Sequence, residues 1–135
     1  MPTHEQIQAT FERVLSDLGL DPATCREGDG WWRFYPDDLP FQGGIHPHEF
    51  QISCALCEID SDADIDAVWS DIKKRNSALT DPLASFTERD NYLWVISRSS
   101  LHGLDQAHLR AMIDACIALA RSDAASALRS SYRQW

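Results

Sequence analysis

Residues 54–76 read CALCEIDSDADIDAVWSDIKKRN, and they join two segments with different hydrophobic periods. Upstream, from Glu49 to Ile59, apolar and polar residues alternate, which is the pattern of a strand with one buried face. Downstream, a helix is predicted to open at Ser61, because its apolar residues recur at helical intervals, namely Ile65, Val68, Trp69, Ile72 and Leu79. The direct passage from a strand into a helix predicts a mixed α+β architecture.

The flanking sequence extends this pattern in both directions. Thr3 and Gln6 have the spacing of a capping box, and a helix is predicted from there to Gly19. The region 21–30 is turn-rich, and 36–48 is expected to be a long loop that holds a short irregular strand at 41–45. Further strands are predicted at 31–35, 83–88 and 92–98, the last two as an antiparallel hairpin. The C-terminal helix is expected to start near Asp105 and to continue through Leu128 toward Tyr132.

The predicted fold class is therefore α+β, an antiparallel sheet with helices in the order α-β-β(-β)-α-β-β-α. A chain of 135 residues with 44% hydrophobic residues can build one core, so we expect a single domain over 1–135. The formal net charge of −9 repels nucleic-acid phosphates and anionic lipids and favours basic or neutral partners. We expect a cytoplasmic protein that binds neither nucleic acid nor membrane, because the N-terminal residues are polar and no apolar stretch approaches a spanning length.

Three stretches carry a resemblance to a known fold family. They are CALCEIDSDADIDAVWSDIKKRN (54–76), the hairpin LASFTERDNYLWVISRSSL (83–101) and the helix GLDQAHLRAMIDACIALA (103–120). In this element order the chain resembles the type III secretion chaperone fold, which the Tir chaperone family and the YbjN-like proteins share. The resemblance implies a homodimer that presents apolar patches to an extended segment of a client protein. It also implies that the protein has no enzymatic activity and no cofactor.

The aromatic residues of the first strands are the candidate partner-binding residues: Trp31, Trp32, Phe34, Tyr35 and Phe41. Neighbours on a strand face opposite sides of the sheet. Either Trp31 and Tyr35 are buried while Trp32 and Phe34 are outside, or the reverse holds. The outer pair would form a binding patch or a dimer seam, unless a helix or the loop near Phe41 covers the second face as well. Tyr92, Trp94 and Ile96 share one face of a later strand and present the same choice.

The groups that could carry chemistry have simpler interpretations. Cys54 and Cys57 form a CxxC, but regular alternation places them on opposite faces, so we expect buried, reduced thiols and no metal site. The nearby His46 and His48 have no common zinc-ligand spacing relative to this pair. The acidic run from Asp60 to Asp66 lacks the glycine of a calcium loop and suits the start of a helix.

No nucleophile elbow or glycine-rich phosphate loop occurs, so an enzyme is not expected. The leading hypothesis is a small acidic protein-binding module, a chaperone-like adaptor that binds a client through apolar sheet and helix surface. The alternatives are a metal-binding or small-molecule-binding protein that uses the 36–57 region, and a regulatory subunit without a client.

Overall fold

The computed structural model describes residues 2–133, so the outermost parts of the predicted 1–135 domain, residue 1 and residues 134–135, lie outside the described residues. The helices are α1 (His4–Asp17), α2 (Pro22–Cys25), α3 (Ile65–Ser77), α4 (Gln106–Ala120) and α5 (Asp123–Tyr132). The strands are β1 (Arg26–Gly28), β2 (Trp31–Phe34), β3 (Phe41–Ile45), β4 (Glu49–Glu58), β5 (Ser85–Arg89) and β6 (Tyr92–Ser100). A short 3-10 turn, η1 (Pro36–Asp38), links β2 to β3.

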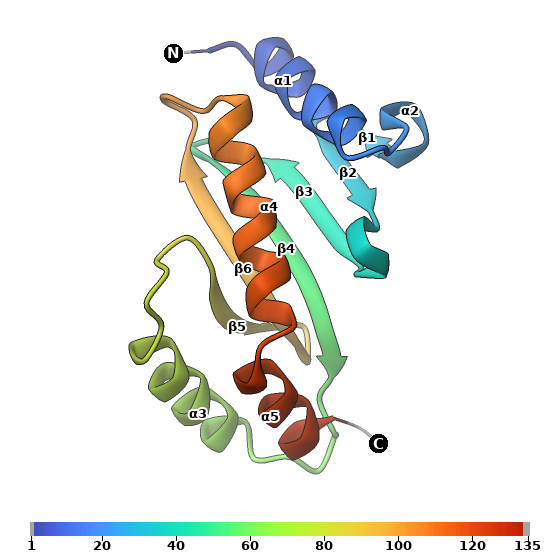
Figure 1. Ribbon diagram of the computed structural model, residues 1–135. Coiled ribbons are helices and arrows are strands. Elements are labelled where there is room, and N and C mark those ends of the chain that lie inside the picture. The colour runs from blue at the N-terminus through green and yellow to red at the C-terminus, as the bar shows by residue number, and fades with distance from the viewer. Residues whose placement is uncertain (1, 134–135) are drawn as a thin grey trace.

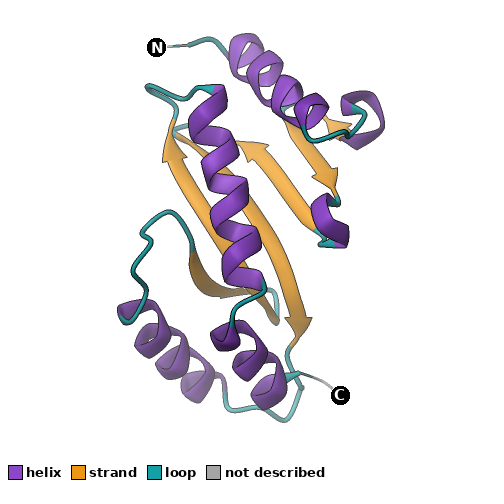
Figure 2. Cartoon of the chain, in the orientation of Figure 1, coloured by secondary structure: helices purple, strands orange, loops and turns teal. Residues whose placement is uncertain are grey.

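The strands form one six-stranded sheet in the order β1-β2-β3-β4-β6-β5, and every neighbouring pair is antiparallel. Figure 1 shows α1 and α4 lying across the same face of this sheet, while α3 and α5 lie near one end of it. Figure 2 shows the same division between a helical layer and a layer of strands. The predicted α+β class with an antiparallel sheet is therefore confirmed.

The structure corrects two predicted helices. The helix expected to open at Ser61 begins at Ile65, because Asp60 accepts a bond from the Asp62 N–H and holds a turn, and Asp64 caps the helix by accepting from the Asp66 N–H. The long C-terminal helix is two helices. It breaks at Ser122, whose hydroxyl donates to the Leu119 carbonyl and accepts from the Ala125 N–H, so that it caps α5.

The short strand expected at 41–45 within a long loop is present with those bounds as β3, and it is regularly paired and not irregular. β3 pairs with β2 on one side and β4 on the other, and Phe41 lies opposite Phe34 and Cys54. The turn-rich region 21–30 also contains elements that the sequence pattern did not predict, α2 and β1. Both are three or four residues long, too short to display a hydrophobic period.

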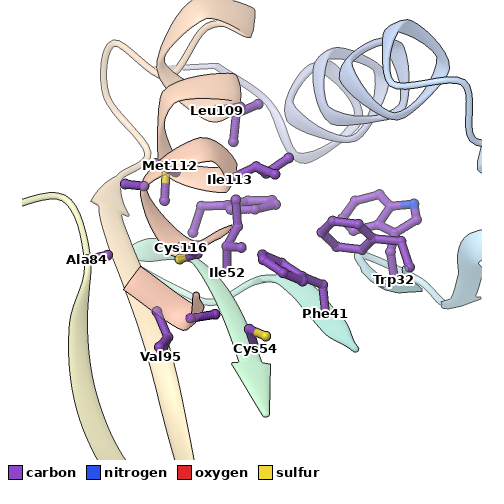
Figure 3. Packing of buried hydrophobic residues seen from close by; sticks show 14 of the residues in the cluster. Trp32, Phe41, Ile52, Cys54, Ala84, Val95, Leu109, Met112, Ile113 and Cys116 are labelled. Atoms are coloured by element: carbon purple, nitrogen blue, oxygen red, sulfur yellow. The ribbon is translucent and has the colours of Figure 1, made fainter. Parts of the chain in front are cut away.

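An aromatic cluster joins α1 to the sheet. The ring of Phe11 lies 4.7 Å from that of Trp32, 4.9 Å from Phe50 and 5.6 Å from Phe34, measured between centroids. A Cβ atom added at Gly43 would come within 3.0 Å of the Phe11 ring, so glycine allows the helix its close approach to β3. Figure 3 shows how α4 completes the core, with Ile113 and Cys116 facing Ile52 and its neighbours.

A half-buried carboxylate ties α1 to the first two strands. Glu12 accepts bonds from Arg26 Nε at 2.8 Å and from the indole N–H of Trp32 at 3.0 Å. Burial opposes ionisation of Glu12, but the hydrogen bonds from Arg26 and Trp32 and the charge of Arg26 outweigh it and lower the pKa of this carboxyl below its ordinary value. The charged form of Glu12 therefore stabilises the fold.

The two edges of the sheet differ. At the β5 edge, the Asn76 side chain of α3 donates to the Phe86 carbonyl at 3.0 Å and accepts from the Phe86 N–H at 2.8 Å. This amide takes the place of a neighbouring strand at Phe86 and thereby blocks that edge at this residue. At the other edge, β1 has three residues and an irregular register that pairs only with Trp31 and Trp32. Among the described residues, Arg33 and Phe34 therefore have no strand neighbour on that side.

We predict that Glu12→Gln lowers stability at neutral pH and that the difference from the wild type shrinks at low pH. A lowered pKa contributes stability above the unfolded-state value, near 4.5, and this contribution is lost as the pH falls through the lower folded-state value. Urea unfolding at neutral pH and at a series of values below 4.5 measures the difference. Glu27→Gln, at an exposed site on β1, is the control. A difference that stays constant with pH would contradict the assignment.

We also predict that Asn76→Ala costs about 1–3 kcal/mol, because it leaves the N–H and C=O of Phe86 without partners. Hydrogen exchange at the Phe86 amide should become faster, and urea unfolding should report the loss of stability. Ser77→Ala is the matched control, since the Ser77 hydroxyl only returns to the Lys73 carbonyl within the same helix. Equal losses in the two variants would argue against a closed edge.

Candidate partner-binding surface

The sheet has a second face, turned away from α1 and α4, which we call the uncovered face. Its side chains alternate with those of the core and come from five strands. They are Trp31 and Arg33 of β2, Gln42 and Gly44 of β3, Glu49, Gln51, Ser53, Ala55 and Glu58 of β4, Ser85, Thr87 and Arg89 of β5, and Tyr92, Trp94, Ile96 and Arg98 of β6.

The structure selects one of the two orientations left open by the sequence. Trp32, Phe34 and Phe41 are in the core, with 0–1% of their surface exposed. Trp31 is 39% exposed and Tyr35 is 55% exposed. Of the five candidate residues, only Trp31 and Tyr35 therefore lie on the surface. Trp32 and Phe34 are buried because they pack with Phe11 of α1, which fixes the side of β2 that faces the helices.

A hollow of about 300 Å³ lies on the uncovered face, with Trp31 on its border and Arg89 also lining it. Gly44, which has no side chain, and the small Ser53, only 5% exposed, contribute to its lining. Large side chains at these two positions would fill the space. The hollow therefore follows from small residues on the central strands between large ones on the outer strands.

On this face, an arginine side chain lies over each of two tryptophan rings. The guanidinium carbon of Arg89 lies 4.8 Å from the centroid of the Trp94 ring, and that of Arg33 lies 6.0 Å from Trp31. A flat guanidinium held over an indole gains a cation–π attraction and keeps its N–H groups available at its edge. These arginines were not among the residues expected to bind a partner. Because side chains alternate along a strand, Arg33 lies on the opposite face from Trp32 and Phe34. The position of Arg33 on the uncovered face could therefore have been predicted from the sequence once Trp32 and Phe34 were known to be buried.

The cysteines do not form a reactive centre. Cys54 and Cys57 were expected on opposite faces, but the strand register shifts between Ala55 and Cys57. Cys57 consequently lies opposite the core residue Leu93, and both cysteines are on the helix side of the sheet. Burial raises the pKa of the Cys54 thiol to about 11 and that of Cys116 to about 12, so both are thiols, not thiolates, at neutral pH.

The metal-binding alternative places its site in the 36–57 region, which includes His46 and His48. The segment 36–57 is mostly strand, and His46 lies beside the hollow described above. Within residues 2–133, no three His, Cys, Asp or Glu side chains come close enough together to hold a metal ion. The same part of the chain contains no helix long and apolar enough to span a bilayer.

No protein-family model matches the chain, and no curated protein sequence matches it significantly. Solved structures do match. A chain in the ExoT–SpcS complex from Pseudomonas aeruginosa is 16% identical with a TM-score of 0.61, and the match covers 89% of this chain and 97% of that one. A chain in the complex of the Yersinia pestis type III secretion chaperone SycH with a stable fragment of YscM2 is 13% identical, with a TM-score of 0.57 and coverage of 90% and 98%.

A third match is a chain of the heterodimeric ExoU–SpcU complex from the type III secretion system of Pseudomonas aeruginosa. It is 15% identical, with a TM-score of 0.57 and coverage of 78% of this chain and 87% of that chain. Identities of 13–16% speak for the fold alone. The resemblance stated from the sequence is thereby confirmed at that level, and the chain has a type III secretion chaperone-like fold.

Proposed function

We propose that this protein is a chaperone-like adaptor that holds a segment of another protein against its uncovered face. The observation that carries the proposal is the exposure of Trp31 on a sheet face that α1 and α4 do not cover, and of Tyr35 directly after the same strand. Large aromatic side chains at a surface usually mark a contact, because their burial against a partner removes much apolar area from water. The fold supports the same class of function, since its solved neighbours are chains of protein complexes that include a type III secretion chaperone.

The buried aromatics have a supporting role in this proposal. Trp32, Phe34 and Phe41 lie beneath the surface and hold β2 in the orientation that exposes Trp31. Of the two sheet edges, the one at β1 is open to strand addition by a partner, because Asn76 closes the other. The proposed role is binding, without catalysis or a cofactor, in the cytoplasm. It is restricted to a protein segment as partner and does not depend on a secretion system.

The test of this surface uses a double variant, Trp31→Ala with Tyr35→Ala. A tagged wild-type chain expressed in its native cell should capture a dominant partner that quantitative mass spectrometry identifies. The amount of that partner recovered by the double variant should fall by a factor of about ten or more, because truncating an anchoring aromatic side chain typically costs about 2 kcal/mol or more of binding free energy. Thermal unfolding of the variant should stay close to that of the wild type, since both side chains are exposed.

Ile65→Ala provides the control, because Ile65 is a large exposed apolar residue on α3 and not on the uncovered face. It should capture as much partner as the wild type. Trp32→Ala cannot serve in this test, since emptying a fully buried indole site costs about 3–5 kcal/mol and threatens the fold itself. Equal recovery by the wild type and the double variant would refute the proposed surface.

We also propose that the protein is a homodimer, as the resemblance implies, with a seam separate from Trp31 and Tyr35. Light scattering coupled to gel filtration should then give about twice the chain mass of 15.3 kDa at micromolar concentration. The Trp31→Ala, Tyr35→Ala variant should keep the dimer mass. A monomeric wild type would contradict the dimer, and a variant that becomes monomeric would identify these aromatics as the dimer seam.

A further inference from the structure

We propose that the segment bound to the uncovered face is acidic: an extended polypeptide whose carboxylates pair with Arg33 and Arg89 while one of its apolar side chains enters the hollow beside Trp31. This inference rests on the proposed function and adds the chemistry of the partner. It runs against the overall net charge of −9, which by itself favours basic or neutral partners.

The uncovered face has a different balance of charge from that of the whole chain. The whole chain has 21 acidic against 12 basic side chains, whereas the uncovered face carries three arginines and two glutamates. One of these glutamates, Glu49, lies 3.6 Å from Arg98, so that pair is largely neutralised. The other, Glu58, lies opposite Tyr92, on the same row of the sheet as Arg89, but the two form no ion pair. The uncovered face therefore carries one more positive than negative side chain, whereas the whole chain has a surplus of negative ones.

Arg33 and Arg89 have no carboxylate partner among the described residues. Arg26, Arg75 and Arg110 each pair with an acidic side chain. Within residues 2–133, neither Arg33 nor Arg89 takes part in an ion pair, although the chain has a surplus of carboxylates. Each lies over a tryptophan instead. A guanidinium oriented in this way offers a ready pair of donors for a bidentate bond to a carboxylate.

The hollow lies beside one of these arginines. Arg89 lines it together with Trp31, so a partner side chain inserted there would contact the indole while a neighbouring carboxylate reaches the guanidinium. Gln42 and Gln51 also line the hollow; Gln42 offers its amide group to a peptide backbone, whereas the Gln51 amide nitrogen already donates to Glu49 at 2.7 Å. An aromatic or aliphatic residue flanked by Asp or Glu in an extended segment matches this arrangement.

Polyanions are a poorer match for the same arginines. A nucleic acid or an anionic membrane would bring a dense array of negative charge close to a chain of net charge −9, and the repulsion would exceed the attraction of two or three arginines. A polypeptide segment brings only a few carboxylates, placed where the arginines lie. The uncovered face therefore favours a short acidic peptide as its partner.

The test is a selection from a random twelve-residue peptide library displayed on phage. The library is first depleted on the Trp31→Ala variant and then selected on the wild-type protein, so that the retained peptides require the uncovered face. The proposal expects enriched sequences with a negative net charge and Asp or Glu beside an aromatic or aliphatic residue. The most enriched peptide is then synthesised with a fluorescent label, and its affinity is measured by anisotropy.

Arg33→Glu and Arg89→Glu should each lower the affinity for this peptide by about tenfold or more, and added salt should lower the affinity of the wild type. Arg110→Glu, at an exposed site on α4, is the matched control and should leave the affinity within about twofold of the wild type. If Arg33→Glu or Arg89→Glu prevents folding, as circular dichroism would reveal, Arg33→Gln or Arg89→Gln replaces it and should still weaken binding.

Three outcomes would overturn the inference. Enriched peptides that are neutral or basic but still require Trp31 would exclude an acidic partner and leave the proposed function standing. An acidic peptide with unchanged affinity for both arginine variants would exclude the proposed contacts. A library with no Trp31-dependent binder, together with a dimer that dissociates in the Trp31→Ala variant, would assign the face to a second copy of this chain and overturn the proposed function as well.

Discussion

The packing of Phe11 against Gly43 and three aromatic side chains is the contact on which the other features depend. Phe11 brings α1 onto the sheet, and the absence of a side chain at Gly43 allows the approach. Trp32 and Phe34 must then face the helix. Because the side-chain period of a strand is two, the same packing turns Trp31 and Arg33 outward. A shift of one residue in β2 would bury the candidate binding residues and expose the core.

The outward face acquires its shape from the same register. Gly44 and Ser53 occupy central positions, and large side chains stand on the outer strands, so the face is hollow near Trp31 and not flat. The edges complete the picture. Asn76 satisfies the backbone of Phe86 at one edge, and the other ends in a short irregular strand. The parts of the molecule that a partner can reach are thus set by backbone hydrogen bonding and by side-chain size together.

The net charge of the whole chain does not describe the charge of the uncovered face. The net charge of −9 describes the average environment, while Arg33 and Arg89 create a different one on a single face. Each arginine is held by a tryptophan, and the aromatic residues that attract attention in the sequence therefore also position the cations. Acidic side chains elsewhere pair with other arginines, such as Glu12 with Arg26, and serve the fold.

The sequence by itself determined the types of the main elements, their order and the overall fold, because long amphipathic helices and alternating strands can be recognised from local hydrophobic periodicity. It could not predict α2 and β1, the break at Ser122 or the shifted register before Cys57, since these depend on a few side-chain hydrogen bonds and on pairing with distant strands. The candidate site was half predictable. Alternation alone divides Trp31 and Tyr35 from Trp32 and Phe34, but which pair is exposed was decided only by the tertiary structure, because it depends on the side of the sheet to which Phe11 and α4 bind.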